Sequence, residues 1–282
     1  MKKMLSMLLL CTMLLTTLTF VSCGEEKVEA ELIDINLTEE SYAFGVSKEQ
    51  PELLEKANDL IKEIKNTGTL DEICDHYFGD GVPEPVETAE LDTSKDQLIV
   101  ATHVYFAPFE YKVGDKYYGI DLEIAALLAD KMNQELVIKE VEFKDLMTTV
   151  YNGEADIIMS GFTLKEERKE YVDFTDTYYE ASQKLIIRND EEAFKKCKTA
   201  DDVLEVLRSM TMSTTIGYLN GTTGGMYVNN EGDYKGNKLK VTGAGYQTGA
   251  LAVEDLMKGR IRGVVLDGGP AESLVREFNA MH

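Results

Sequence analysis

Few side chains in this sequence have a type and spacing that could carry chemistry on their own. The three histidines and four cysteines lie far apart and form no CxxC pair, so we expect no metal and no cofactor. The glycine-rich residues 221–225 lack the Lys-Ser or Lys-Thr pair of a phosphate-binding loop. Asp267 ends an apolar run and could bind a cation at a strand end or cap the next helix. Arg168 stands in a charged run that, taken alone, is typical of an exposed face.

The elements that would position these side chains alternate between strand and helix. Short apolar runs predict strands at residues 98–102, 136–141, 155–160, 184–188, 215–218, 238–242 and 263–266. Helical periodicity predicts helices at residues 120–130, 144–151, 200–209 and 249–258. This alternation indicates an α/β fold with mostly parallel sheets. The two groups of strands divide near residue 188, which favours two lobes over one sheet.

The front of the folded part differs from the rest because it carries helices without intervening strands. Residues 51–65 begin with Pro51 and place their apolar residues on one helical stripe, and Thr69 to Glu72 predicts a capping box for a second helix. Residues 80–97 hold two prolines and many acids without periodicity, which is typical of a linker.

The extreme N-terminus has the pattern of an export signal. Residues 1–22 combine two lysines with an uncharged apolar stretch that is short for a membrane span, although a retained single span is the alternative. The residues around Cys23 resemble a bacterial lipoprotein cleavage box. That resemblance implies that Cys23 is lipidated and anchors the chain outside the cell membrane, with residues 23–30 as a tether.

Composition narrows the classes of function. Hydrophobic residues make up 44% of the 282 residues and charged residues 28%, as in an ordinary globular protein. A formal net charge of −22 repels phosphate backbones, so we expect no nucleic-acid partner. Cys74 and Cys197 are expected to be buried free thiols, with a disulfide between them as the alternative.

Several motifs, in order, resemble the family 3 extracellular solute-binding proteins, the polar amino acid receptors of ABC importers. The first lobe of that family is similar to residues 101–111 (ATHVYFAPFEY), 161–168 (GFTLKEER) and 172–179 (VDFTDTYY). The second lobe is similar to residues 216–224 (IGYLNGTTG) and 264–267 (VVLD). The resemblance implies a bilobed, type II periplasmic-binding fold whose lobes are joined by a two-strand hinge.

The order of the segments suggests a circular permutation of that fold. Residues 32–46 resemble the strand and hinge that normally follow the aspartate segment, and residues 48–78 resemble the family's closing helices. The expected parts are residues 31–46 as lobe II strand and hinge crossing, 47–79 as lobe I helices, 80–97 as permutation linker, 98–188 as lobe I and 189–282 as lobe II. A rearranged gene fragment, or a swap of residues 30–79 with a neighbouring molecule, is the alternative.

The resemblance also implies the roles of ten residues at a ligand site. Arg168 would bind the α-carboxylate of an amino acid through its planar guanidinium, and Asp267 would accept the α-ammonium group. The surrounding residues would donate hydrogen bonds or form the walls, namely Ser160, Gly161, Thr163, Thr222, Thr223, Phe106 and Phe143. His103 stands where many relatives have an acidic or amide residue facing the ligand side chain, so the identity of the amino acid stays open.

The function implied is that of a monomeric binding protein, not an enzyme. Its two lobes would close on a free amino acid, and the closed form would deliver that ligand to an ABC permease. One alternative is an enzyme of the same fold that resembles periplasmic dehydratases, which would need a general acid in the cleft. Two functions without catalysis also fit the sequence: a lipoprotein that senses a ligand without transport, and a structural relic in which the permutation abolished closure.

Overall fold

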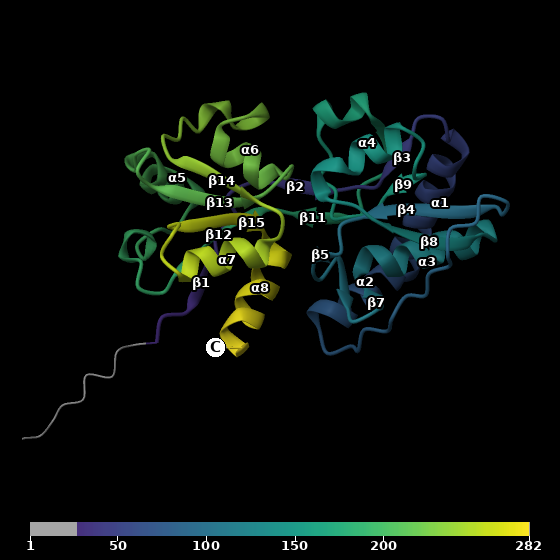
Figure 1. Cartoon of the computed structure of the whole chain (residues 1–282), viewed down its shortest axis with the longest axis horizontal. Helices are drawn as coiled ribbons and strands as arrows, with labels where there is room; N and C mark the ends of the chain where they lie inside the picture. The colour runs from purple at the N-terminus through teal and green to yellow at the C-terminus, as the bar shows by residue number, and fades with distance from the viewer. Residues whose placement is uncertain (1–26, 282) are drawn as a thin grey trace, which may run out of the picture.

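The computed structural model describes residues 27–281, which form two α/β lobes joined by a pair of strands (Figure 1). Lobe II contains a five-stranded sheet in the order β1-β12-β15-β13-β14. Its strands are β1 (Ala30–Ile33), β12 (Gln183–Arg188), β13 (Thr215–Leu219), β14 (Thr242–Tyr246) and β15 (Gly263–Asp267). Its helices are η3 (Glu192–Phe194), α5 (Ala200–Ser209), α6 (Thr223–Asn229), η4 (Gly232–Gly236), α7 (Gly249–Met257) and α8 (Gly268–Met281).

Lobe I contains a second five-stranded sheet, in the order β10-β3-β9-β4-β8. Its strands are β3 (Gly45–Ser47), β4 (Gln97–Thr102), β8 (Glu135–Glu140), β9 (Ile157–Ile158) and β10 (Val172–Phe174). Its helices are α1 (Pro51–Thr67), α2 (Thr69–Phe78), α3 (Ile120–Met132), η1 (Phe143–Asp145), α4 (Leu146–Tyr151) and η2 (Glu166–Glu170). A small antiparallel sheet extends the lobe through β5 (Tyr105–Phe106), β6 (Glu110–Val113) and β7 (Lys116–Tyr118).

The two large sheets have equivalent topologies. In lobe I, β4 runs parallel to β8 and β9, and β3 lies antiparallel between β9 and β10. In lobe II, β13 runs parallel to β14 and β15, and β12 lies antiparallel between β15 and β1. The predicted α/β type II bilobed fold with mixed sheets is therefore confirmed. The sheets are not mostly parallel as expected, because each large sheet has two parallel and two antiparallel strand pairs.

Two antiparallel strands cross between the lobes as the hinge. β2 (Glu40–Tyr42) pairs with β11 (Tyr179–Ala181), and both lie between the lobes in Figure 1. After the crossing, β2 leads into β3 of lobe I, and β11 leads into β12 of lobe II. The expectation that residues 98–188 all belong to lobe I therefore differs from the structure at β12, which pairs in the sheet of lobe II.

Helices cover both faces of each sheet because neighbouring strand residues point to opposite faces. In lobe II, Leu185 and Val265 pack in a cluster with Val203 of α5, whereas Val264 and Leu266 pack in the cluster that contains residues of α7. The first strands and helices, β1, β3, α1 and α2, also bury side chains in the hydrophobic core. The buried stripe of α1 consists of Leu53, Ala57, Leu60, Ile61 and Ile64.

Some local predictions were wrong in detail. The capping box at Thr69 is absent, because α2 begins at Thr69 itself and its N-cap is Gly68 in a left-handed conformation (φ 83°). The strand expected at residues 238–242 lies instead at Thr242–Tyr246. The linker at residues 80–97 is largely irregular until β4 begins at Gln97, and Val86 forms one isolated bridge with Tyr117.

Two further properties bear on the predictions. Cys74 and Cys197 are free, as expected, although both are half-buried rather than fully buried. Within residues 27–281, no helix has the length and apolar character that a bilayer crossing needs. The predicted signal at residues 1–22 and the lipidation site Cys23 lie outside the described residues.

Candidate functional site between the lobes

The ten predicted site residues gather where the strands of the two sheets end and the lobes face each other. His103 and Phe106 follow β4, Phe143 follows β8, and the run from Ser160 to Thr163 follows β9. On lobe II, Thr222 and Thr223 follow β13, and Asp267 is the last residue of β15. All ten residues are buried, including Gly161 and Arg168. The fold therefore brings the two sets of residues to the facing edges of the two lobes.

Arg168 is a buried cation inside an exposed charged run. Its neighbours in η2 are exposed, whereas Arg168 itself is 4% exposed and its guanidinium lies 4.3 Å from the centre of the Phe162 ring. Nη1 donates to the carbonyl oxygen of Thr163 at 2.9 Å, and Nη2 donates to that of Gly221, on lobe II, at 3.1 Å. No ion pair joins Arg168 to a carboxylate of the described residues. Burial lowers the pKa of Arg168 to about 10, although the charges of Glu40 and Asp267 act in the opposite direction.

Asp267 is the corresponding buried anion of lobe II. It is 2% exposed, and its Oδ1 accepts a hydrogen bond of 2.7 Å from the hydroxyl of Tyr42 on the hinge. Burial and the charge of Glu40 raise the pKa of Asp267 to about 7, and the Tyr42 hydrogen bond opposes that rise. The sequence offered two interpretations of Asp267, a cation site at a strand end and a cap of the next helix. Its position is compatible with both, because it ends β15 and immediately precedes α8. Within residues 27–281 it has no ion-pair partner.

The loop after β9 is held in place by two buried acids. Ser160 Oγ donates to Glu110 Oε1 at 2.8 Å, and the amide of Gly161 donates to Asp121 Oδ2 at 2.8 Å. Gly161 has a φ of 49°, and a Cβ atom there would lie 2.6 Å from the Phe106 ring, so glycine is required. Burial raises the pKa of Glu110 and raises that of Asp121 to about 7. These contacts fix the loop that supplies the first-lobe side of the site.

Three aromatic rings line the first-lobe side. The rings of Phe106 and Phe143 are 6.3 Å apart and inclined by 39°, and the ring of His103 lies 6.4 Å from that of Phe143. The Nδ1 atom of His103 is 3.3 Å from the carbonyl oxygen of Val141. Burial lowers the pKa of His103, which favours the neutral imidazole.

The threonines of lobe II stand at the start of a helix. Thr222 is the N-cap residue of α6, and its hydroxyl donates to the carbonyl oxygen of Leu219 at 2.7 Å. The amides of Thr222 and Gly225 donate to the carbonyl oxygens of Leu219 and Thr222 at 3.3 and 3.1 Å, so among the described residues the amides of Thr223 and Gly224 remain available to an anion at this helix start. The hydroxyl of Thr223 donates to Glu40 Oε2 at 2.7 Å, and the hydroxyl of Thr163 donates to the same oxygen at 3.1 Å.

Glu40 and Tyr42 are the site residues that the sequence reasoning missed. Both lie on hinge strand β2, and both are buried between the lobes. Residues two apart on a strand share a face, so the polar pair at positions 40 and 42 was the available signal. Their segment lies far from the site motifs in sequence, so the spacing alone does not connect them with the other site residues.

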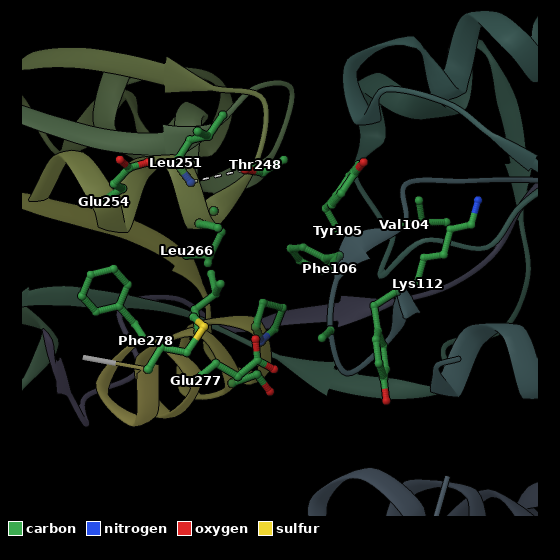
Figure 2. Close-up of a pocket in the computed structure, with 18 of the residues that line it drawn as sticks. Val104, Tyr105, Phe106, Lys112, Thr248, Leu251, Glu254, Leu266, Glu277 and Phe278 are labelled. Atoms are coloured by element: carbon green, nitrogen blue, oxygen red, sulfur yellow. Dashed lines mark hydrogen bonds between the residues drawn. The ribbon is translucent and has the colours of Figure 1, made fainter. Parts of the chain in front are cut away.

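A large cavity lies beside this group, also between the lobes (Figure 2). It has a volume of about 940 Å³. Lobe I contributes Tyr105 and Phe106, and lobe II contributes Leu251 and Phe278, so the lining is largely apolar. Of the ten predicted residues, only Phe106 lines it. The polar residues at the strand ends are therefore packed against each other rather than exposed to this space.

Two α/β lobes, a two-strand hinge and buried polar groups at the facing strand ends define a type II periplasmic-binding fold. Residues 98–226 match the family described as bacterial extracellular solute-binding proteins, family 3. The arginine-bound form of truncated ArgBP from T. maritima is 30% identical, with a TM-score of 0.54, over 64% of this chain and 78% of that chain. The chain belongs to this family.

Curated relatives match over shorter segments. The arginine-binding extracellular protein ArtP of Bacillus subtilis is 37% identical over 99 residues, which are 35% of this chain and 39% of that protein. A probable histidine-binding protein of Neisseria gonorrhoeae is 27% identical over 178 residues, which are 63% of this chain and 61% of that protein. The chain thus spans less than two thirds of the length of either relative.

Proposed function

We propose that this protein binds a free amino acid between its lobes outside the cytoplasm and delivers it to an ABC importer. The observation that carries the proposal is a pair of buried charges without ion-pair partners among residues 27–281: Arg168 on lobe I and Asp267 on lobe II. A buried charge is costly unless an opposite charge satisfies it. An α-amino acid presents a carboxylate and an ammonium group on one carbon, so it can satisfy both.

The remaining predicted residues complete this site in the proposal. The amides at the start of α6 and the loop from Ser160 to Thr163 hold the carboxylate beside Arg168. Phe106 and Phe143 form walls for the side chain of the ligand, and His103 faces its end. Because Arg168 already donates to carbonyl oxygens of both lobes, ligand binding exchanges these neutral acceptors for a carboxylate.

The ligand we favour carries a positive side chain. Among the described residues, the buried ionisable groups at the site include the carboxyls of Glu40 and Asp267 and the guanidinium of Arg168, with Glu110 and Asp121 behind the loop after β9, so acids outnumber bases. A zwitterion leaves that balance unchanged, whereas a cationic side chain neutralises it. The relatives named for arginine and histidine binding agree with this choice.

The proposal includes a lipid anchor at Cys23 and an extracytoplasmic location. The support is the lipoprotein-like sequence around Cys23 and membership of a family described as extracellular. Metabolic labelling with a fatty acid tests it: the wild type should incorporate label, and Cys23→Ser should not. Equal labelling of both proteins would contradict the anchor.

We also propose that the chain is a circular permutation of the family's order. β9 and β10 of lobe I occupy the same sheet positions as β15 and β1 of lobe II. In lobe I, β10 is the next strand of the sheet after β9 in the sequence. In lobe II, β15 is the last strand in the sequence and β1 is the first. These ends lie together, because the side chain of Asn279 exchanges hydrogen bonds of 3.0 and 2.8 Å with the backbone of Ala30. A variant that joins residue 281 to residue 27 and opens the chain within residues 80–91 should fold as a monomer with the same ligand affinity. Failure of that variant to fold would contradict the proposal.

A thermal-shift screen against the twenty amino acids tests the function. A ligand that binds only the folded state raises the melting temperature, and the wild type should respond to L-arginine most strongly. Arg168→Ala should melt near the wild-type temperature without ligand and show no shift with it. A variant that retains the shift would contradict the site, and turnover of prephenate-like acids by the wild type would favour the dehydratase alternative.

A further inference from the structure

Glu40 sits at the centre of a buried hydrogen-bond network on hinge strand β2. Its side chain is 5% exposed. Its carboxylate accepts five hydrogen bonds. Oε1 accepts from the hydroxyls of Thr38 and Tyr234, each at 2.9 Å. Oε2 accepts from the hydroxyls of Thr223 at 2.7 Å and Thr163 at 3.1 Å and from Nε2 of Gln183 at 3.4 Å. Glu40, which accepts all of these hydrogen bonds, is not among the ten site residues predicted from the sequence.

The donors belong to different lobes. Thr163 follows β9 of lobe I, whereas Thr223 begins α6 and Tyr234 lies in η4, both in lobe II. Glu40 itself is on the crossing strand. A hydrogen bond is lost once donor and acceptor separate beyond about 3.5 Å. Rotation of the lobes away from each other therefore breaks the contacts to at least one lobe, and only the closed arrangement satisfies all of them.

An ion pair also joins the lobes in this region, and it is more exposed than the network around Glu40. Lys165 of lobe I pairs with Asp233 of lobe II at 2.9 Å and lies 4.8 Å from the centre of the Tyr234 ring. The side chain of Asp233 is 75% exposed, so water screens that ion pair. The network around Glu40 is buried, where hydrogen bonds to a carboxylate are stronger.

The network also limits what Glu40 can do to a ligand. A threonine hydroxyl has one proton, and those of Thr163 and Thr223 are already donated to Glu40. The carboxylate of a bound amino acid must therefore rely on Arg168 and on backbone amides. Glu40 acts on the ligand through the position of the two lobes, not by touching it.

We propose that Glu40 is a positioning residue that stabilises the closed arrangement of the lobes in the absence of ligand. The proposal rests on the proposed function in one respect, namely that the amino acid binds between closed lobes. If only the closed fraction binds, the apparent dissociation constant equals the intrinsic constant divided by that fraction. A smaller closed fraction therefore weakens every ligand by the same factor.

Glu40→Gln tests this inference, with Glu39→Gln as the control. Glu39 is the exposed neighbour, so its replacement makes the same change in net charge outside the network. Isothermal titration with two ligands of equal charge, L-glutamine and L-asparagine, should show both weakened about tenfold in Glu40→Gln and unchanged in Glu39→Gln. L-Arginine is left out of this comparison because its positive side chain would also lose the charge of Glu40. Small-angle X-ray scattering of the ligand-free proteins should show a larger radius of gyration for Glu40→Gln alone. Should Glu40→Gln fail to fold, Tyr234→Phe removes a single lobe II donor and should produce a smaller change of the same kind.

The outcomes separate the inference from the proposed function. Unchanged affinity and scattering in folded Glu40→Gln would overturn the role of Glu40, as would a loss that differs between the two ligands. If the wild type binds no amino acid, the proposed function fails, while the ligand-free scattering still tests Glu40. A more expanded ligand-free Glu40→Gln would support the inference in that case too.

Discussion

Ligand affinity should depend on pH through Asp267. The carboxyl group must be ionised to pair with an ammonium group, yet burial and the charge of Glu40 raise its pKa to about 7. Below that pH the ligand must displace a proton, so affinity should fall about tenfold per pH unit. Between pH 8 and pH 5 the dissociation constant for L-arginine should rise about a hundredfold, or about 2.7 kcal/mol.

Isothermal titration in buffers of different ionisation enthalpy measures both parts of this prediction. At pH 6 the wild type should release close to one proton on binding, and at pH 8 almost none. Asp267→Asn preserves an acceptor for the Tyr42 hydroxyl but cannot ionise, so its affinity should be lower at pH 8 and should lack the hundredfold fall that the wild type shows down to pH 5. His103 titrates in both proteins and therefore cancels in the comparison. Parallel pH profiles for the wild type and Asp267→Asn would refute the reasoning.

Two further predictions concern stability. Burial raises the folded-state pKa of Asp121 from 3.8 to about 7, so its contribution to stability is present at low pH and is lost as pH rises to 7. Between pH 5 and pH 7.5 the wild type should therefore lose about 2.5 kcal/mol more of its free energy of unfolding than Asp121→Asn does, as measured with urea. Equal losses in the two proteins would contradict this prediction. Ile61 on α1 is 1% exposed, so Ile61→Ala should lower the free energy of unfolding by about 2–5 kcal/mol, whereas the exposed control Glu55→Ala should change it by less than about 0.5 kcal/mol. Similar melting of both variants would mean that the front helices are dispensable.

The fold could be predicted from sequence wherever apolar runs and helical stripes were long enough to be distinctive. β14 was misplaced because its core contains Gly243 and Gly245, which look like a loop in the sequence. In the structure a Cβ atom at these positions would lie 2.3 Å from Asn229 Oδ1 and 1.9 Å from Asn220 Oδ1. The side chains that demand glycine there lie elsewhere in the chain, so local patterns cannot reveal the strand.

The residues of the candidate site also differ in how far the sequence alone could identify them. Asp267 could be selected from its place at the end of an apolar strand, but Arg168 looked exposed among its charged neighbours. Its burial depends on Phe162 and on the Gly221 turn of the other lobe, which the run around Arg168 does not encode. Glu40 was missed because its partners, such as Thr223, are brought to it only by the hinge.

A crystal structure with bound L-arginine tests the central claim most directly. The account predicts the α-carboxylate within hydrogen-bonding distance of the Arg168 guanidinium and the α-ammonium group beside the Asp267 carboxylate. Arginine bound only in the cavity lined by Leu251 and Phe278, with Arg168 still donating to protein carbonyl oxygens alone, would contradict it.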